Sequence, residues 1–264
     1  MTTRTTQRLL LNMGVISMCA LAASPAWSEP AKTTFTTGFD YSTGKYGQAE
    51  DTKITYLPLI GKYEMDRLTL KLTVPYIKIE GPGGVTPDSR VVGAIPTGNN
   101  RRVSEDGLGD VVLAASYNAL ELHSQKTYID VGAKIKLPTA SESRGLGTGK
   151  VDYSVLADAY KTMGKNTLIA TVGYKVFGDP DGIDLNNVFF ASLGTSYKLD
   201  DKNSLGVSVD LRQKTTDTST GLREYSVFHS HKFDNTYKLQ SYLVFGDTRS
   251  SVDVGGGMML GINW

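Results

Sequence analysis

The sequence predicts an all-β protein: a single antiparallel transmembrane β-barrel of about 12 strands with both termini in the periplasm. Three observations predict this fold class. Apolar and polar residues alternate with a period of two through most of the chain after residue 28. The alternating segments are longer than the roughly five to six residues of an ordinary strand. The connections between them are short and long in turn, as in outer-membrane barrels.

The N-terminus has the features of a signal peptide. Arg4 and Arg8 precede an apolar run from residue 9 to 23, and Ala26-Trp27-Ser28 forms a small-residue cleavage pattern. The apolar run is shorter than the roughly 20 residues that a membrane-spanning helix needs. We therefore expect residues 1–28 to be removed on export and residues 29–264 to form one outer-membrane barrel.

Composition supports a β protein and argues against a nucleic-acid partner. The chain has 28 Gly and 14 Tyr, and its one cysteine, Cys19, lies in the predicted signal peptide, so the mature chain cannot form a disulfide. Of 28 basic and 27 acidic residues, only Arg4 and Arg8 fall in the signal peptide, which leaves a mature charge of minus one. Such a balance predicts no binding of nucleic acid. No motif predicts a cofactor or a metal site.

Residues 204–212 show the alternation most clearly. Leu205, Val207, Val209 and Leu211 share one face of a strand, and polar or small residues occupy the other. Twelve segments of this kind are expected, near 33–43, 50–63, 67–79, 108–118, 126–137, 150–162, 166–177, 185–199, 203–213, 222–233, 236–247 and 252–264. Most have 11 to 15 residues, enough for the roughly 9 to 11 that cross a bilayer at a tilt.

The connections divide into two sets. Tight turns are expected at 64–67, 163–166, 200–203 and 233–236, with a slightly longer one at 119–125, and longer loops at 44–49, 80–107, 138–149, 178–184 and 214–221. Short periplasmic turns opposite long extracellular loops are typical of membrane barrels. A soluble β-sandwich also alternates, but it would have shorter strands and no such asymmetry.

A barrel in lipid must close, because an open sheet edge would leave backbone groups unpaired in hydrocarbon. We expect the first and last strands to pair. Trp264, preceded at two-residue spacing by Ile262, Leu260 and Met258, resembles the C-terminal aromatic signal by which the barrel assembly machinery recognises its substrates. That machinery and the outer-membrane lipids are the expected partners. Aromatic residues at strand ends would suit interface girdles, although some are expected simply to favour strands.

Several short motifs carry a family resemblance. Gly107-Leu108-Gly109-Asp110, then 136–140 (KLPTA), 145–149 (GLGTG) and Asp152-Tyr153, resemble the outer-membrane family labelled putative MetA pathway of phenol degradation. The resemblance implies a barrel that helps small, often aromatic, compounds cross the outer membrane, and it supplies no catalytic residues. From the residues themselves, we expect 145–149 to be a hairpin tip and the glycines at 107 and 109 to serve a structural role.

The polar face should line the lumen. The candidate lumen residues are Asp110, Asp130, Lys134, Lys136, Asp152, Asp158, Lys175, Lys198, Asp210 and Arg212. Alternation in the segment 50–63 also predicts that Lys53 faces inward. A basic strip of Lys134, Lys136, Lys175, Lys198 and Arg212 would favour anionic compounds, whereas a charge ladder matched by Asp130, Asp158 and Asp210 would be structural. The sequence leaves open whether the lumen is water-filled or sealed. Twelve strands permit only small solutes.

The predicted loop 80–107 is the longest and carries Arg90, Arg101 and Arg102, which could constrict the mouth or simply be solvated. The expected function is a channel or transporter for small, aromatic or anionic, organic compounds rather than an enzyme. One alternative is a barrel-embedded lipid hydrolase that uses His229, Ser230 and His231, but adjacent strand positions point to opposite faces and separate the serine from both histidines. Another is a sealed structural or adhesion barrel.

Overall fold

A computed structural model describes residues 31–82, 85–88, 91–94 and 102–264. The predicted signal peptide, residues 1–28, lies outside the described residues. Within the described residues, no helix is long and apolar enough to cross a membrane. The strands are β1 (Lys32–Gly44), β2 (Thr52–Met65), β3 (Leu68–Pro82), β4 (Val85–Asp88), β5 (Val91–Ala94), β6 (Arg102–Leu108), β7 (Val111–Leu122), β8 (Thr127–Leu137), β9 (Asp152–Met163), β10 (Asn166–Val176), β11 (Val188–Lys198), β12 (Asn203–Arg212), β13 (Leu222–Lys232), β14 (Tyr237–Gly246) and β15 (Val254–Asn263).

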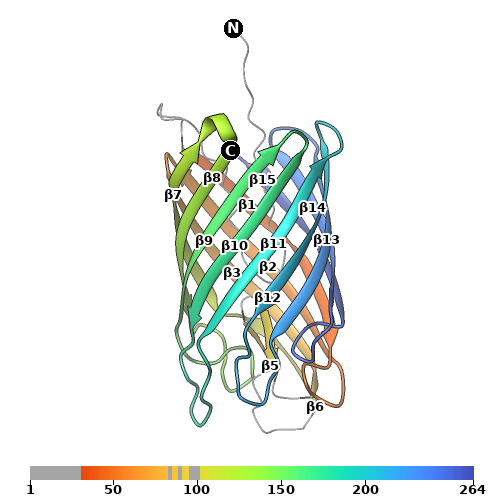
Figure 1. Cartoon of the computed structure of the whole chain (residues 1–264). Helices are drawn as coiled ribbons and strands as arrows, with labels where there is room; N and C mark the ends of the chain where they lie inside the picture. Colours follow the sequence, from red (N-terminus) through yellow and green to blue (C-terminus); the bar gives the residue numbers. More distant parts are fainter. Residues whose placement is uncertain (1–30, 83–84, 89–90, 95–101) are drawn as a thin grey trace.

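Twelve wall positions close into one antiparallel barrel (Figure 1). Each strand pairs with its neighbours in sequence, and β1 pairs with β15 from Thr34 opposite Asn263 to Thr43 opposite Val254. The fourth wall position is shared by two strands, because β6 pairs with the far half of β3 and β7 with its near half. The predicted 12-strand barrel is therefore confirmed, and the pairing of β1 with β15 closes the sheet, as a lipid environment requires.

The two ends of the barrel differ. The end here called the turn end carries the start of β1, the C-terminus at Trp264, tight turns such as Asp66-Arg67, and a 3-10 helix, η1 (His123–Gln125), in the slightly long turn. The other end, the loop end, carries the connections 45–51, 83–101, 138–151, 177–187, 213–221 and 247–253 (Figure 1).

Acidic side chains build two of the tight turns. The Asp200 carboxylate accepts hydrogen bonds from the backbone N–H groups of Lys202 and Asn203 at 2.7 and 2.8 Å. Asp234 accepts from the N–H groups of Thr236 and Tyr237, both at 2.7 Å. Aspartate favours such turns because its short side chain pairs with backbone donors two or three residues ahead.

The outward face is apolar along its middle and aromatic at both rims. Leu193, at the centre of β11, is 58% exposed. Exposed outward aromatic residues near the turn end are Tyr63, Tyr117, Tyr197, Phe233, Tyr237 and Trp264, and near the loop end Tyr41, Tyr76, Tyr153, Phe189, Tyr225 and Phe245. Two aromatic girdles around an apolar band are the pattern that a bilayer selects.

The long loop expected at 80–107 is shorter in the structure. β3 runs on to Pro82, and β6 begins at Arg102 and pairs with it. The prediction was wrong at both ends because a strand as long as β3 needs a partner along its whole length. A small hairpin of β4 and β5 lies within the remaining connection.

Candidate functional site

The barrel interior is the candidate site. All ten predicted lumen residues are inward by strand parity or buried: seven are buried, and Lys134, Lys175 and Lys198 are half-buried. The buried seven are Asp110, Asp130, Lys136, Asp152, Asp158, Asp210 and Arg212. Most inward side chains around the wall are buried as well. The described interior is therefore closely filled by its own side chains.

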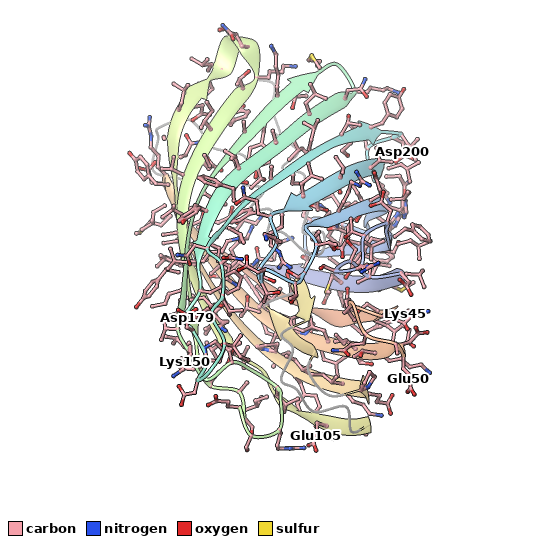
Figure 2. The ribbon with its side chains drawn as sticks, turned by 60° about the horizontal axis from the view of Figure 1, so that its bottom comes forward. Lys45, Glu50, Glu105, Lys150, Asp179 and Asp200 are labelled. Carbon is pink, nitrogen blue, oxygen red and sulfur yellow. The ribbon has the colours of Figure 1, made fainter. Side chains whose placement is uncertain are left out.

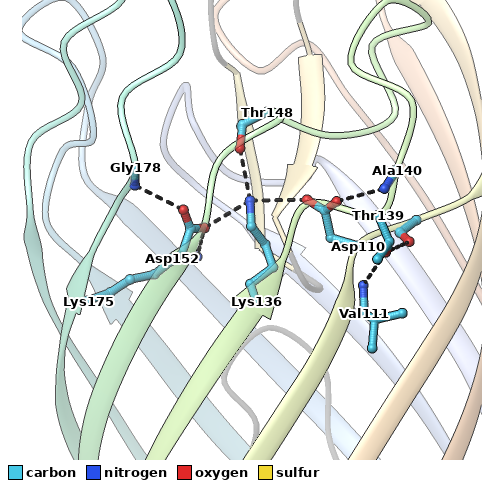
Figure 3. Close-up of polar contacts among 10 residues, drawn as sticks. Asp110, Val111, Lys136, Thr139, Ala140, Thr148, Asp152, Lys175 and Gly178 are labelled. Atoms are coloured by element: carbon cyan, nitrogen blue, oxygen red, sulfur yellow. Dashed lines mark hydrogen bonds and ion pairs between the residues drawn. The ribbon is translucent and has the colours of Figure 1, made fainter.

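Lys136 is the centre of a charged network near the loop end (Figure 3). Its Nζ lies 3.1 Å from Asp110 Oδ2 and 3.0 Å from Asp152 Oδ2, and it donates to Thr148 Oγ1 at 2.9 Å. Lys175 Nζ reaches the same Asp152 oxygen at 3.1 Å. Because three of these ionic groups come from β8, β9 and β10, the network ties adjacent strands together. We call Lys136, Asp110, Asp152 and Thr148 the latch.

The latch holds the connection 138–151 over the loop end. Asp110 Oδ1 accepts from the backbone N–H of Ala140 at 3.0 Å, and Thr139 Oγ1 donates to the carbonyl of Gly109 at 3.0 Å (Figure 3). Both ends of the connection are thus bound to the network, Thr148 at one end and residues 139–140 at the other.

The motif at 145–149 is buried in this arrangement. A Cβ at Gly147 would lie 2.7 Å from Ala140 Cβ and 2.9 Å from the Asp110 carboxylate, so only glycine fits there. Leu146 is 1% exposed. Residues 145–149 lie in the connection between β8 and β9, as expected of a hairpin tip. The tip turns toward the lumen because Leu146, its one apolar side chain, packs in an apolar cluster inside the barrel.

That apolar cluster fills the loop end of the lumen. Leu146 belongs to this cluster, and the full set is Tyr46, Ile54, Tyr56, Ile77, Ile79, Ala140, Leu146, Val244 and Val252. Burial raises the pKa of the Tyr46 phenol. The contacts close this end of the barrel with side chains from β2, β3, β14 and three connections.

In β2, the structure corrects the prediction of which side chains face the lumen. Lys53 was expected to point inward, but it is exposed, and Thr52, Ile54, Tyr56 and Ile60 are buried. The sequence is ambiguous here because apolar residues occupy both parities, and the inward ones belong to the apolar cluster.

Acidic residues form a row across the inner wall. Asp130 and Asp158 are directly opposite on β8 and β9, and Asp210 and Glu224 are opposite on β12 and β13. Like charges in such positions destabilise a sheet unless neighbours compensate. Asn118 Nδ2 donates to Asp130 at 2.7 Å, and Thr171 Oγ1 to Asp158 at 2.5 Å.

A second apolar layer lies nearer the turn end. Tyr160 and Ile169 from β9 and β10 pack with Phe228 and Tyr242 from β13 and β14, and Tyr128 contacts the layer. The Tyr242 hydroxyl donates to the Asp40 carboxylate. Side chains from well-separated wall positions therefore meet across the lumen.

The predicted basic strip is not assembled. Lys136 and Lys175 both contact Asp152, and Lys198 pairs with Asp201 of the adjacent turn at 2.7 Å. The carboxylates that these lysines contact are Asp152 and Asp201, whereas the expected charge ladder used Asp130, Asp158 and Asp210, so that ladder stays a prediction. Of the predicted constriction residues, Arg90 and Arg101 lie outside the described residues, and Arg102 begins β6.

The histidine–serine pattern of strand β13 is split between two faces. Ser230 is buried inward, whereas His229 Nε2 and His231 Nδ1 both approach Asn203 Oδ1, at 3.1 and 2.8 Å. The two histidine rings thus share an acceptor at the turn end and do not contact the serine. The described residues contain no cluster of His, Cys, Asp and Glu suited to a metal.

Charged residues also rim the loop end. Figure 2 shows Lys45, Glu50, Glu105, Lys150 and Asp179 around it, with Asp200 toward the other end. Arg144 Nε pairs with Glu105 at 2.7 Å and so joins the latched connection to β6. The Lys150 ammonium, 2.9 Å from Asp181, holds the pKa of that carboxyl below its usual range.

Comparisons with known proteins agree with this architecture. The family model "Putative MetA-pathway of phenol degradation" matches residues 33–248, and the chain belongs to that family. The COG4313 outer membrane channel from Pseudomonas putida F1 is similar, with a TM-score of 0.67 and 15% identity over 92% of this chain and 100% of that one. The KdgM porin has a TM-score of 0.52 and 11% identity over 88% and 98%. No curated protein matches. This chain is a β-barrel of the bacterial outer membrane.

Proposed function

We propose that the protein is a channel for small organic compounds, with the loop end outside the cell and both termini in the periplasm. The observation that carries this is the charged inner wall beneath a closure made of side chains from both strands and loops. A purely structural interior has no need of so many ionisable groups, because each costs desolvation energy. Loop-end closure by the connection 138–151 gives the wall a movable cover.

In this account the described state is closed. The latch and the apolar cluster hold the cover in place, and its release exposes the polar wall to water. The narrow 12-strand lumen restricts passage to small solutes. The KdgM porin, whose fold is similar, has also been solved in complex with disordered oligogalacturonate, and this supports an organic compound as the solute; its TM-score to this chain is 0.51, at 10% identity over 88% of this chain and 98% of that one.

The remaining partners follow from the surface. The outward aromatic girdles are proposed to contact outer-membrane lipids. Trp264, which is 70% exposed, is proposed to be recognised by the barrel assembly machinery. For the substrate we propose only a chemical class: small organic compounds, including aromatic and anionic ones.

Swelling of proteoliposomes tests the function. Vesicles containing the purified barrel should swell in isosmotic solutions of a pentose and stay unchanged in a trisaccharide. A deletion strain should grow more slowly on a subset of aromatic compounds and organic acids, and the intact gene should restore growth. Vesicles impermeable to all solutes, together with unchanged growth, would support the sealed structural barrel instead.

A further inference from the structure

Three neighbouring strands direct small hydroxyl side chains into the lumen. Successive inward residues are serine, glycine and serine at 192–196 of β11, the same at 204–208 of β12, and serine, phenylalanine and serine at 226–230 of β13. The register places Ser204 directly opposite Ser230 and Ser208 directly opposite Ser226. We call the six serines the serine patch: Ser192, Ser196, Ser204, Ser208, Ser226 and Ser230. The patch is a continuous hydroxyl-bearing part of the inner wall.

Three hydroxyls of the serine patch are buried without a partner. Ser196, Ser226 and Ser230 are each 2% exposed, and their Oγ atoms make no hydrogen bond to a described residue. A buried hydroxyl in that state costs free energy, whereas an alanine of nearly the same size would not incur that cost. Packing alone therefore does not account for serine at these positions. Hydroxyls that can both donate and accept suit a bound molecule that does the same.

One aromatic ring covers the serine patch. Phe228, the inward residue between Ser226 and Ser230, is 1% exposed and lies directly opposite Gly206. A Cβ added at Gly206 would overlap the Phe228 ring, so glycine is needed for the ring to lie there. The ring also packs in the layer that contains Tyr160, Ile169 and Tyr242. Phe228 is the one bulky side chain among the inward residues of 192–196, 204–208 and 226–230.

Two carboxylates border the serine patch on the side of the loop end. Asp210 and Glu224 are directly opposite each other, one inward position beyond the serines of β12 and β13. Glu224 Oε1 accepts from the N–H of Val252 at 3.0 Å, and Glu224 Oε2 makes no hydrogen bond to a described residue. Asp40 and Arg212 both lie within electrostatic reach of Glu224. A hydroxyl group brought to this border could donate to the remaining carboxylate oxygen.

The lysines on the side of the turn end already have partners. Lys198 Nζ lies 2.7 Å from Asp201 Oδ1, and Lys232 Nζ donates to Asn235 Oδ1 at 2.9 Å. The inward positions of the serine patch itself carry no charged residue. Its hydroxyls, with carboxylates at one border and paired lysines at the other, therefore suit a neutral molecule with several hydroxyl groups better than an anion.

We propose that the serine patch binds neutral polyhydroxylated solutes, such as a pentose, and that Phe228 covers the patch when no solute is bound. The hydroxyls of a sugar can pair with the serines, and its C–H faces can lie against the rings of Phe228 and Tyr242. Entry of the sugar requires the Phe228 ring to turn away from Gly206. A role in transport rests on the proposed channel function, whereas binding can be measured on the folded barrel.

Thiol labelling tests whether Phe228 covers the patch. Ser226→Cys replaces one Oγ by sulfur, and residues 29–264 contain no cysteine of their own. In the folded barrel in detergent, this thiol should react slowly with methyl methanethiosulfonate. Phe228→Ala should accelerate the reaction about tenfold or more, and Phe228→Leu, which keeps more apolar volume, should accelerate it less. An unchanged rate in Phe228→Ala, once its heat-resistant folded form is verified, would contradict the cover.

Phe190→Ala is the matched control for this labelling. The Phe190 ring on β11 lies over Gly173 and packs with Leu156, in a cluster separate from that of Phe228. The substitution removes the same aromatic group from the same lumen but should leave the labelling rate of Ser226→Cys unchanged. Equal acceleration by Phe190→Ala and Phe228→Ala would indicate general loosening of the interior and would overturn the proposed cover.

Protection by a sugar tests the ligand class. In the Phe228→Ala background, xylose should slow the labelling of Ser226→Cys saturably, by about fivefold or more, and 1,4-dioxane, a ring without hydroxyls, should not. Ser196→Ala combined with Ser230→Ala should abolish the protection without lowering the unfolding temperature, because neither hydroxyl makes a hydrogen bond to a described residue. Equal protection by xylose and dioxane, or protection that survives the two substitutions, would contradict the site.

Swelling of proteoliposomes separates this site from the channel function. Ser196→Ala combined with Ser230→Ala should slow swelling in xylose relative to the wild type. Saturable xylose protection in a barrel whose vesicles never swell would support the site and contradict the channel. Swelling in xylose without any protection of the Ser226→Cys thiol would overturn the site and leave the channel standing.

Discussion

Lys136 donates a hydrogen bond to Thr148 Oγ1 at 2.9 Å, across the connection that follows its own strand. The same Nζ contacts Asp110 and Asp152, so one ammonium group fixes the end of β8, the start of β9 and the cover between them. The motif at 107–110 is distant in sequence from those at 136–140 and 145–149, and this contact set brings the three together in the fold.

Removal of this ammonium should loosen the barrel. Lys136→Met keeps the length of the side chain but leaves the buried Asp110 carboxylate without its cation and Asp152 with Lys175 alone, so the free energy of unfolding should fall by about 3 to 5 kcal/mol. Guanidinium-induced unfolding of the barrel in lipid vesicles measures this free energy. Lys150→Met, which removes only an exposed pair with Asp181, is the control and should leave the midpoint unchanged. An unchanged midpoint for Lys136→Met would show that the latch is dispensable.

The cover should protect its own buried residue. Residues 29–264 contain no cysteine, and Cys19 lies in the predicted signal peptide, so single cysteines can be introduced in the barrel without a competing thiol there. Leu146→Cys should react slowly with a maleimide, and Ser143→Cys, at an exposed position of the same connection, should react quickly. Equal rates would mean that the connection does not pack into the lumen.

The outward face should reject charge most strongly at mid-membrane. Leu193→Arg, at the centre of β11, should cost about 2 to 4 kcal/mol of unfolding free energy, and Leu199→Arg, just beyond the strand, about 0 to 1 kcal/mol. Reversible unfolding from lipid vesicles compares them. If the two variants lost the same stability, the placement of β11 across the bilayer would be incorrect.

Lipid hydrolysis should be absent. Ser230 faces inward and His229 and His231 face outward, so this strand does not bring its serine hydroxyl and an imidazole together to form a nucleophile. The purified barrel should release no fatty acid from phospholipid vesicles, and Ser230→Ala should behave identically. Turnover that disappears in Ser230→Ala would restore the hydrolase alternative.

The sequence was sufficient for the wall of the barrel. Alternation identifies strands such as 203–213, because lipid and lumen impose opposite polarity on neighbouring residues. Alternation gave the wrong facing where apolar residues occupy both faces of a strand. In β2, Ile54 and Tyr56 face inward and Leu57 faces outward, and all three are apolar. The prediction therefore relied on the charge of Lys53 and placed that residue on the wrong face.

Contacts between distant segments were beyond the sequence. Lys136 and Lys175 looked like parts of a basic strip, since parity shows which way a side chain points and not which carboxylate it meets. Leu146 and Thr148 were overlooked as functional residues. The signal that could have identified them is one leucine and one threonine among three glycines. An exposed hairpin tip is usually built from polar residues and glycine, so a leucine there indicates burial.

Single-channel recording tests the central claim that the connection 138–151 closes a conducting lumen. The wild type should be mostly closed with brief openings, and a variant in which residues 141–147 are replaced by a two-residue turn should stay open. Planar bilayers that remain silent with the shortened variant, once its heat-resistant folded form is verified, would contradict the account and favour a barrel whose interior is permanently filled.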